Sequence, residues 1–138
     1  MNAGFFITAT DTDVGKTFVS YLIARGLQRA GVNFSYIKPV ATGGKMVRGE
    51  LVSPDVIFLK KYLRLRARHD ELNPVCLRAP LAPYPAARME KKKIDTKKIL
   101  DAVRAAARQH RVAIIEGIGG VAVPITRRRV MLPLETFG

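Results

Sequence analysis

Three consecutive residues, Gly15, Lys16 and Thr17, have the chemistry needed to bind the phosphate groups of a nucleotide. Glycine lets the backbone approach a phosphate, lysine neutralises its terminal oxygens, and a threonine hydroxyl can coordinate Mg²⁺. An apolar run at residues 5–8 precedes them and an amphipathic stretch at 16–30 follows. The predicted order is therefore strand, phosphate loop and helix.

The loop departs from the strict phosphate-loop pattern at its beginning. That pattern has a glycine five residues before Gly15, where this chain has Thr10, and the nearest small residue is Ala9. If the position of Ala9 requires a positive φ, alanine introduces strain there. We expect a weakened loop rather than a lost one.

Apolar periodicity predicts the elements that position this loop. A helix is expected over 16–30, where six apolar residues recur at three- and four-residue spacing and would share one buried face: Phe18, Val19, Leu22, Ile23, Leu27 and Ala30. Further strands are predicted at 34–37 and 112–115, with a short extended piece at 121–125. Ser53 and Pro54 begin a second helix, and Asp95 or Thr96 caps a third.

Two segments lack such periodicity. Residues 41–49 are polar and glycine-rich, so we expect a mobile loop. Residues 73–87 are rich in proline and predict an irregular extended segment.

Alternating strands and helices predict an α/β fold, a P-loop NTPase-like parallel sheet flanked by helices. Ligands of such sheets bind beyond the carboxyl ends of the strands. Lys38 follows the second strand and Glu116 the third, so both should converge on the phosphate loop. Each also has a simpler interpretation, as a charged residue at the end of a strand, and Asp55 could be only an acid at the start of a helix.

Composition limits the classes of protein to consider. A chain of 138 residues with 48% apolar residues fits one folded domain over 1–138 and argues against disorder. No apolar run reaches membrane-spanning length and no signal peptide is evident, so a cytoplasmic location is expected. Cys76 is the single cysteine and cannot form an internal disulfide; it is interpreted as a small apolar residue.

The net charge of +13 suggests an anionic partner: nucleic acid, anionic lipid or a nucleotide. Basic residues gather at 60–68, 88–98 and 127–129 without the interleaved aromatic residues of a base-stacking surface. Solvated basic faces explain each cluster taken alone. A basic nucleic-acid-binding module nevertheless remains an alternative.

Four motifs follow one another along the chain: TDTDVGKT in the loop, Lys38-Pro39-Val40 followed by Thr42, Ser53-Pro54-Asp55, and Glu116-Gly117-Ile118-Gly119-Gly120. They occur in the order found in dethiobiotin synthetases, and the chain resembles that family. The resemblance implies a cytoplasmic, homodimeric, Mg²⁺- and ATP-dependent ligase of biotin synthesis. Its reaction forms a carbamate from 7,8-diaminononanoate and CO₂, phosphorylates it with ATP, and closes the ureido ring of dethiobiotin.

The resemblance also implies a role for each matching residue. Lys16 and Lys38 would be catalytic, and Thr12 and Thr42 would contact the substrate. Thr17, Asp55 and Glu116 would bind Mg²⁺, an all-oxygen set that suits this ion. The residues expected to bind ATP are Asp13, Val14, Gly15, Lys16, Thr17, Phe18, Asp55, Glu116, Gly117, Ile118 and Gly119.

The resemblance extends only over the front portion of a synthetase, and Ala9 stands where the family usually has glycine. A doubly wound domain continues through about two or three more strands, which in the family form the adenine pocket and much of the dimer contact. The fold is therefore expected to be incomplete at its C-terminal end. An inactive nucleotide-binding remnant and another P-loop ATPase, of the partitioning or metal-insertion type, are the alternatives.

Overall fold

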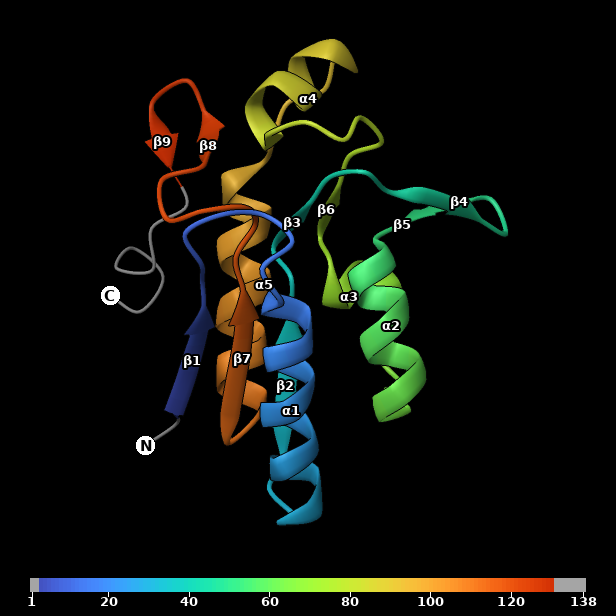
Figure 1. The fold of residues 1–138 in the computed structure, drawn as a ribbon, viewed down its shortest axis with the longest axis vertical. Helices are drawn as coiled ribbons and strands as arrows, with labels where there is room; N and C mark the ends of the chain where they lie inside the picture. The colour runs from blue at the N-terminus through green and yellow to red at the C-terminus, as the bar shows by residue number, and fades with distance from the viewer. Residues whose placement is uncertain (1–2, 131–138) are drawn as a thin grey trace.

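A computed structural model describes residues 3–130 of the chain. Its centre is a parallel three-stranded sheet of β1 (Ala3–Ile7), β7 (Val112–Glu116) and β2 (Phe34–Ile37), in the order β1-β7-β2. Helix α1 (Lys16–Arg29) covers one face of the sheet and α5 (Thr96–Gln109) covers the other (Figure 1). The predicted parallel sheet flanked by helices is confirmed.

Strand β7 is the centre of the sheet and is buried throughout its length. Its apolar run VAII suits a parallel strand that is covered on both faces. Side chains alternate between these faces, so Ile114 packs with Tyr36 and helix α2 (Pro54–Leu63), whereas Ile115 packs with Val103 of α5. Glu116 is two residues beyond Ile114, so its side chain points to the same face of the sheet, the face that α1 covers.

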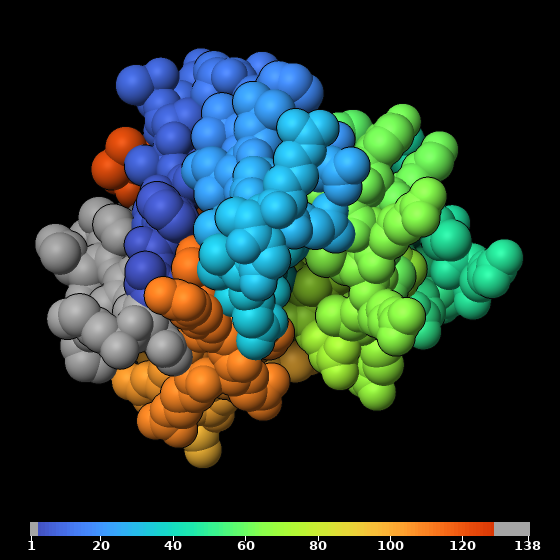
Figure 2. All heavy atoms as spheres, turned by 90° about the horizontal axis from the view of Figure 1, so that it is seen from below, coloured from blue at the N-terminus to red at the C-terminus, as the bar shows by residue number. Residues whose placement is uncertain are grey.

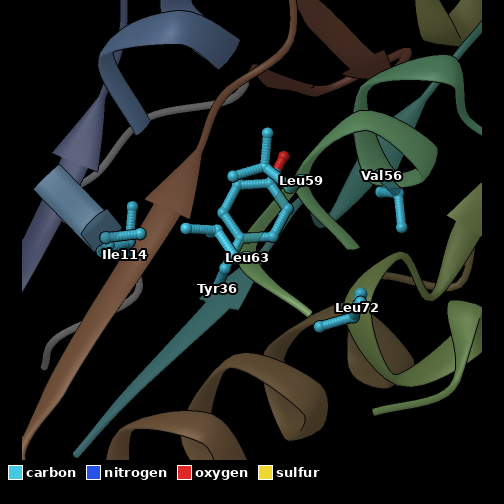
Figure 3. Close-up of a cluster of buried hydrophobic side chains, with 7 residues drawn as sticks. Tyr36, Val56, Leu59, Leu63, Leu72 and Ile114 are labelled. Atoms are coloured by element: carbon cyan, nitrogen blue, oxygen red, sulfur yellow. The ribbon is translucent and has the colours of Figure 1, made fainter. Parts of the chain in front are cut away.

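The largest apolar cluster joins the sheet to α2 and to the short helix α3 (His69–Leu72). Figure 3 shows its side chains meeting from the strands on one side and from these two helices on the other. Its buried members are Ala24, Tyr36, Val56, Leu59, Leu63, Leu72 and Ile114. The cluster holds the start of α2, and therefore Asp55, beside the end of the sheet.

The prediction of which face of α1 is buried is partly wrong. Ile23 and Leu27 pack against the core, but Phe18, Val19 and Leu22 are exposed, as is Ala30. The residues of α1 that are fully buried are Ser20 and Ala24. The helix therefore presents small residues to the sheet, because a close approach leaves no room for large ones.

The segment 41–49 is not the irregular loop that its composition predicts. It contains the end of β3 (Val40–Ala41), and its β4 (Lys45–Val47) forms a hairpin with β5 (Glu50–Val52). Arg48 and Gly49 form the turn, both with positive φ. The hairpin extends beyond α2 at the margin of the molecule (Figures 1 and 2).

The prediction of an irregular segment at 73–87 is also wrong in part. It contains β6 (Val75–Cys76), which pairs in parallel with β3, and most of α4 (Pro83–Met89). Pro83 occupies the first turn of α4, where proline needs no hydrogen-bond partner. After β7, a glycine turn leads to the hairpin of β8 (Pro124–Thr126) and β9 (Arg129–Val130).

Candidate active site at the carboxyl ends of the strands

The phosphate loop connects β1 to α1 and ends at Gly15, the N-cap of α1. Gly15 has φ 102°, a left-handed conformation that glycine adopts without steric cost. The Lys16 ammonium donates a hydrogen bond to the Asp11 carbonyl at 3.1 Å. Lys16 therefore spans the loop from the first turn of the helix.

Ala9 does not have the positive φ that would have made it strained. Among the described residues, the non-glycine residues with a positive φ are Asp13, Arg48, Arg64 and Lys91. Of these, Asp13 is the one that lies in the phosphate loop. Aspartate tolerates the left-handed region better than most residues. The condition for the expected strain at Ala9 is therefore not met.

Glu116 is the buried acid of the site, with no exposed surface. Its Oε1 accepts a hydrogen bond from Thr17 Oγ1 at 2.7 Å and lies 2.8 Å from Lys38 Nζ. Its Oε2 accepts hydrogen bonds from Ser20 Oγ and Tyr36 Oη, each at 2.9 Å. A buried carboxylate needs this number of donors to offset its lost hydration.

Lys38 lies between the two carboxylates. Its Nζ is 2.7 Å from Asp55 Oδ2 and 2.8 Å from Glu116 Oε1, and its side chain is only 6% exposed. Burial alone would lower the pKa of Lys38, but the charges of Glu116 and Asp55 outweigh burial and raise it. Burial next to Glu116 also raises the pKa of Tyr36 well above its ordinary value. Lys38 is therefore a cation and Tyr36 a neutral hydrogen-bond donor near neutral pH.

The backbone at Lys38 is fixed by Asn73, a residue that the motifs did not indicate. Asn73 Nδ2 donates to the carbonyls of Lys38 at 2.7 Å and Val75 at 2.9 Å. The Lys38 N–H donates to the Leu72 carbonyl at 2.7 Å. The last residue of α3 and the residue after it thus hold the end of β2 in place.

These groups border a cleft of about 570 Å³ beside the carboxyl ends of β1, β2 and β7. It is lined by Thr12, Asp13, Gly15, Lys16, Thr17, Phe18, Lys38, Thr42, Pro54, Asp55, Phe58, Glu116, Ile118 and Gly119. Twelve of these fourteen residues were expected to bind a ligand or take part in catalysis; the additions are Pro54, which lies in the third motif without an assigned role, and Phe58.

Two residues expected at the site, Val14 and Gly117, do not line this cleft. Val14 is exposed on the loop. Gly117 is buried, and its N–H donates to the Ile7 carbonyl at 2.9 Å. A Cβ at Gly117 would come within 3.2 Å of the Phe6 ring, so this glycine allows close packing against β1.

Three residues that hold the site together were missed: Ser20, Tyr36 and Asn73. Ser20 could have been found, because a residue three positions after Thr17 lies on the same helix face. Tyr36 could have been found from strand alternation, being two residues before Lys38 on a predicted strand. Nothing in the local pattern indicates Asn73.

The oxygen donors of the cleft fit Mg²⁺. Thr17, Asp55 and Glu116 supply one hydroxyl and two carboxylates, the hard oxygen ligands that this ion prefers. The Lys38 ammonium already occupies a cation position between the two carboxylates. Across residues 3–130 there is no group of three or more His, Cys, Asp and Glu side chains that could hold a metal. A site built on carboxylates alone is therefore not found in that part of the chain.

Comparison with known proteins agrees with this geometry. The AAA domain family matches residues 3–135, nearly the whole chain. The chain belongs to the AAA domain family. Within this family, the P-loop NTPase-like fold predicted from the sequence is confirmed.

Similar curated proteins carry the name ATP-dependent dethiobiotin synthetase. One from Akkermansia muciniphila is 44% identical over 88% of this chain and 53% of that protein. One from Methanococcus vannielii is 40% identical over 88% of this chain and 54% of that protein. One from Methanocaldococcus jannaschii is 37% identical over 96% of this chain and 60% of that protein. The predicted resemblance to dethiobiotin synthetases is confirmed.

The chain spans about half the length of the curated relatives that it matches. No helix within residues 3–130 is both long and apolar enough to cross a membrane.

Proposed function

We propose that this chain binds Mg²⁺-ATP and uses it in the ring closure of a dethiobiotin synthetase. The observation that carries the proposal is the convergence of Lys16, Lys38 and Glu116 on one cleft, from three separate segments of the chain. The names of the relatives support the choice of reaction. The one family match over 3–135 supports one domain over residues 1–138.

The ATP phosphates would lie at the start of α1. Lys16 and the first N–H groups of this helix are positive groups beside the loop, and Asp13, Gly15 and Phe18 border the same cleft. Asp55 and the turn at Glu116, Ile118 and Gly119 would approach the nucleotide from the other side. Val14 and Gly117 would contribute through the backbone conformation of their turns.

Thr17, Asp55 and Glu116 would hold Mg²⁺. When bound, the ion would neutralise the negative charge of the phosphate oxygens. Lys38 would then be free to turn from the carboxylates toward the substrate, since a second cation would share their charge.

The reaction needs positive charge beside the anionic carbamate and beside the phosphoryl group that is transferred. First, an amine of 7,8-diaminononanoate adds to CO₂ and loses a proton to give a carbamate. The carbamate oxygen then attacks the γ-phosphorus of ATP, and ADP leaves. Finally the second amine attacks the carbamate carbon, phosphate leaves and the ring closes. Lys38 and Lys16 would hold the anionic carbamate and the transferred phosphoryl group.

Thr12 and Thr42 would contact the diamine or its carbamate. Both line the cleft, Thr12 from the loop after β1 and Thr42 just after β3. Their hydroxyls could accept hydrogen bonds from an amine and donate them to a carbamate oxygen. The homodimer and the cytoplasmic location remain predictions from the family resemblance.

The experiment is turnover by the purified 138-residue chain with ATP, MgCl₂, 7,8-diaminononanoate and bicarbonate. We expect phosphate and dethiobiotin in equal amounts, and loss of both in Lys38→Met. The matched control is Lys97→Met, on α5, which should retain turnover. Phosphate release without ring product, or no release at all, would contradict the proposed activity of this chain.

A further inference from the structure

We propose that Ser20 and Tyr36 are positioning residues that hold Glu116 Oε2 in the protein interior and reserve Oε1 for the cleft. The inference rests on the proposed function, because it assigns how the acid is oriented toward a bound cation. It extends the site to two residues that the motifs do not contain.

The two oxygens of Glu116 have different surroundings. Oε1 receives Thr17 and Lys38, both of which line the cleft. Oε2 receives Ser20 and Tyr36, which do not line it and are 0% and 2% exposed. One oxygen is thus directed to the ligand side and the other is enclosed by two neutral hydroxyl donors.

The two donors reach Oε2 from different elements, so they fix the rotation of the carboxylate and not only its position. Ser20 lies on α1, three residues after Thr17, so the two hydroxyls share the helix face that meets β7. Tyr36 lies on β2 in register with Ile114, two residues before Glu116 on the same side of the sheet. Helix and sheet therefore fix the orientation of one side chain together.

Both donors are suited to this role chemically. The serine and tyrosine hydroxyls are uncharged, so they satisfy Oε2 without neutralising the negative charge that a cation at Oε1 would require. The Tyr36 ring packs in the largest apolar cluster (Figure 3), which restrains the direction in which its hydroxyl points. Groups that orient a metal ligand in this way typically contribute tenfold to 100-fold in metal affinity.

The test compares ATP affinity in MgCl₂ with ATP affinity in EDTA, measured by calorimetry on the 138-residue chain. The ratio of these affinities isolates the contribution of Mg²⁺. In Tyr36→Phe and Ser20→Ala, we expect this ratio to fall roughly tenfold each, while affinity in EDTA stays unchanged. Tyr84→Phe, on α4, and Ser35→Ala, whose hydroxyl donates to the Ala106 carbonyl, are matched controls that should keep the ratio.

Two results would overturn the inference. A ratio unchanged in both variants would mean that the hydroxyls do not orient Glu116. An equal loss of affinity in MgCl₂ and in EDTA would mean a structural role alone. Failure of the proposed function can be told apart from failure of this inference, because the unaltered chain would then show no gain in ATP affinity from Mg²⁺. Circular dichroism checks folding, and if Tyr36→Phe does not fold, Ser20→Ala decides the question.

Discussion

Lys38 is the buried cation on which the charge balance of the cleft depends. Substitution Lys38→Met removes the partner of Glu116, which has no exposed surface, and leaves an uncompensated carboxylate. We expect the free energy of unfolding to fall by about 3 kcal/mol. Urea denaturation at pH 7 measures this. The exposed Lys97→Met on α5 should change it by less than about 0.5 kcal/mol. A loss below about 1 kcal/mol in Lys38→Met would mean that the interior tolerates the unpaired acid.

Cys76 should be a slow nucleophile. Burial first, and then the negative charge of Glu90, raise the pKa of its thiol to about 11. A raised pKa lowers the thiolate fraction, by about 100-fold at pH 8, and the greater nucleophilicity of a more basic thiolate offsets about tenfold of this. We expect alkylation by iodoacetamide at pH 8 to be about tenfold slower than in the urea-unfolded chain. Equal rates in the folded and unfolded chains would contradict the raised pKa.

Single residues were predictable where a local pattern carries their chemistry. Gly15, Lys16 and Thr17 stand together in sequence, and Glu116 directly follows a buried strand. Local spacing could place Ser20 on the helix face of Thr17 and Tyr36 on the strand face of Lys38, but their hydrogen bonds to Glu116, 96 and 80 residues away in sequence, follow only from the fold.

At the scale of elements, two glycines with free space around them test how backbone conformation affects stability: Gly15 at the N-cap of α1 and Gly26 inside the helix. A Cβ at Gly15 or at Gly26 would meet no atom within 4 Å, so neither alanine substitution clashes. Gly15 has φ 102° and Gly26 lies inside the helix. We expect Gly15→Ala to destabilise by about 1 kcal/mol and Gly26→Ala to stabilise by about 0.5–1 kcal/mol. Urea midpoints that shift in the same direction would contradict this assignment of the cap.

The cap of α5 gives a second test of an element. The Asp95 side chain accepts a hydrogen bond from the Lys98 N–H at 3.1 Å. Removing the acceptor in Asp95→Ala should cost about 1 kcal/mol of stability. Asp101→Ala, an exposed position inside the same helix, is the matched control. An equal shift of the thermal midpoint in both variants would mean that the cap contributes nothing specific.

Elements whose apolar residues repeat at the spacing of a helix or a strand were predicted close to their observed bounds. The second strand was predicted at 34–37 and is β2 (Phe34–Ile37). The failures are in segments whose structure depends on distant partners. The strand β6 exists because Val75 and Cys76 pair with β3, and nothing within 73–87 specifies that pairing. The exposed side chains of Phe18 and Leu22 fit helical spacing, which identifies a helix but not which face is covered.

In the whole molecule, the sheet order explains why distant residues form one site. Because β7 lies between β1 and β2, the end of the last long strand meets both the phosphate loop and Lys38. The sequence predicted that these strand ends converge, but not that β7 is central. The order depends on pairing between residues about 80 to 110 positions apart, such as Tyr36 with Ile114 and Phe5 with Ile114.

The central claim is that the cleft binds the phosphates of Mg²⁺-ATP through Lys16, and calorimetric titration of the 138-residue chain tests it most directly. We predict saturable binding of one nucleotide per chain. Affinity should fall roughly 10- to 150-fold in Lys16→Ala, since a charged hydrogen bond contributes about 1.5–3 kcal/mol. Lys97→Ala should bind as the unaltered chain does. Absence of binding, or equal affinity in Lys16→Ala and the unaltered chain, would contradict the claim.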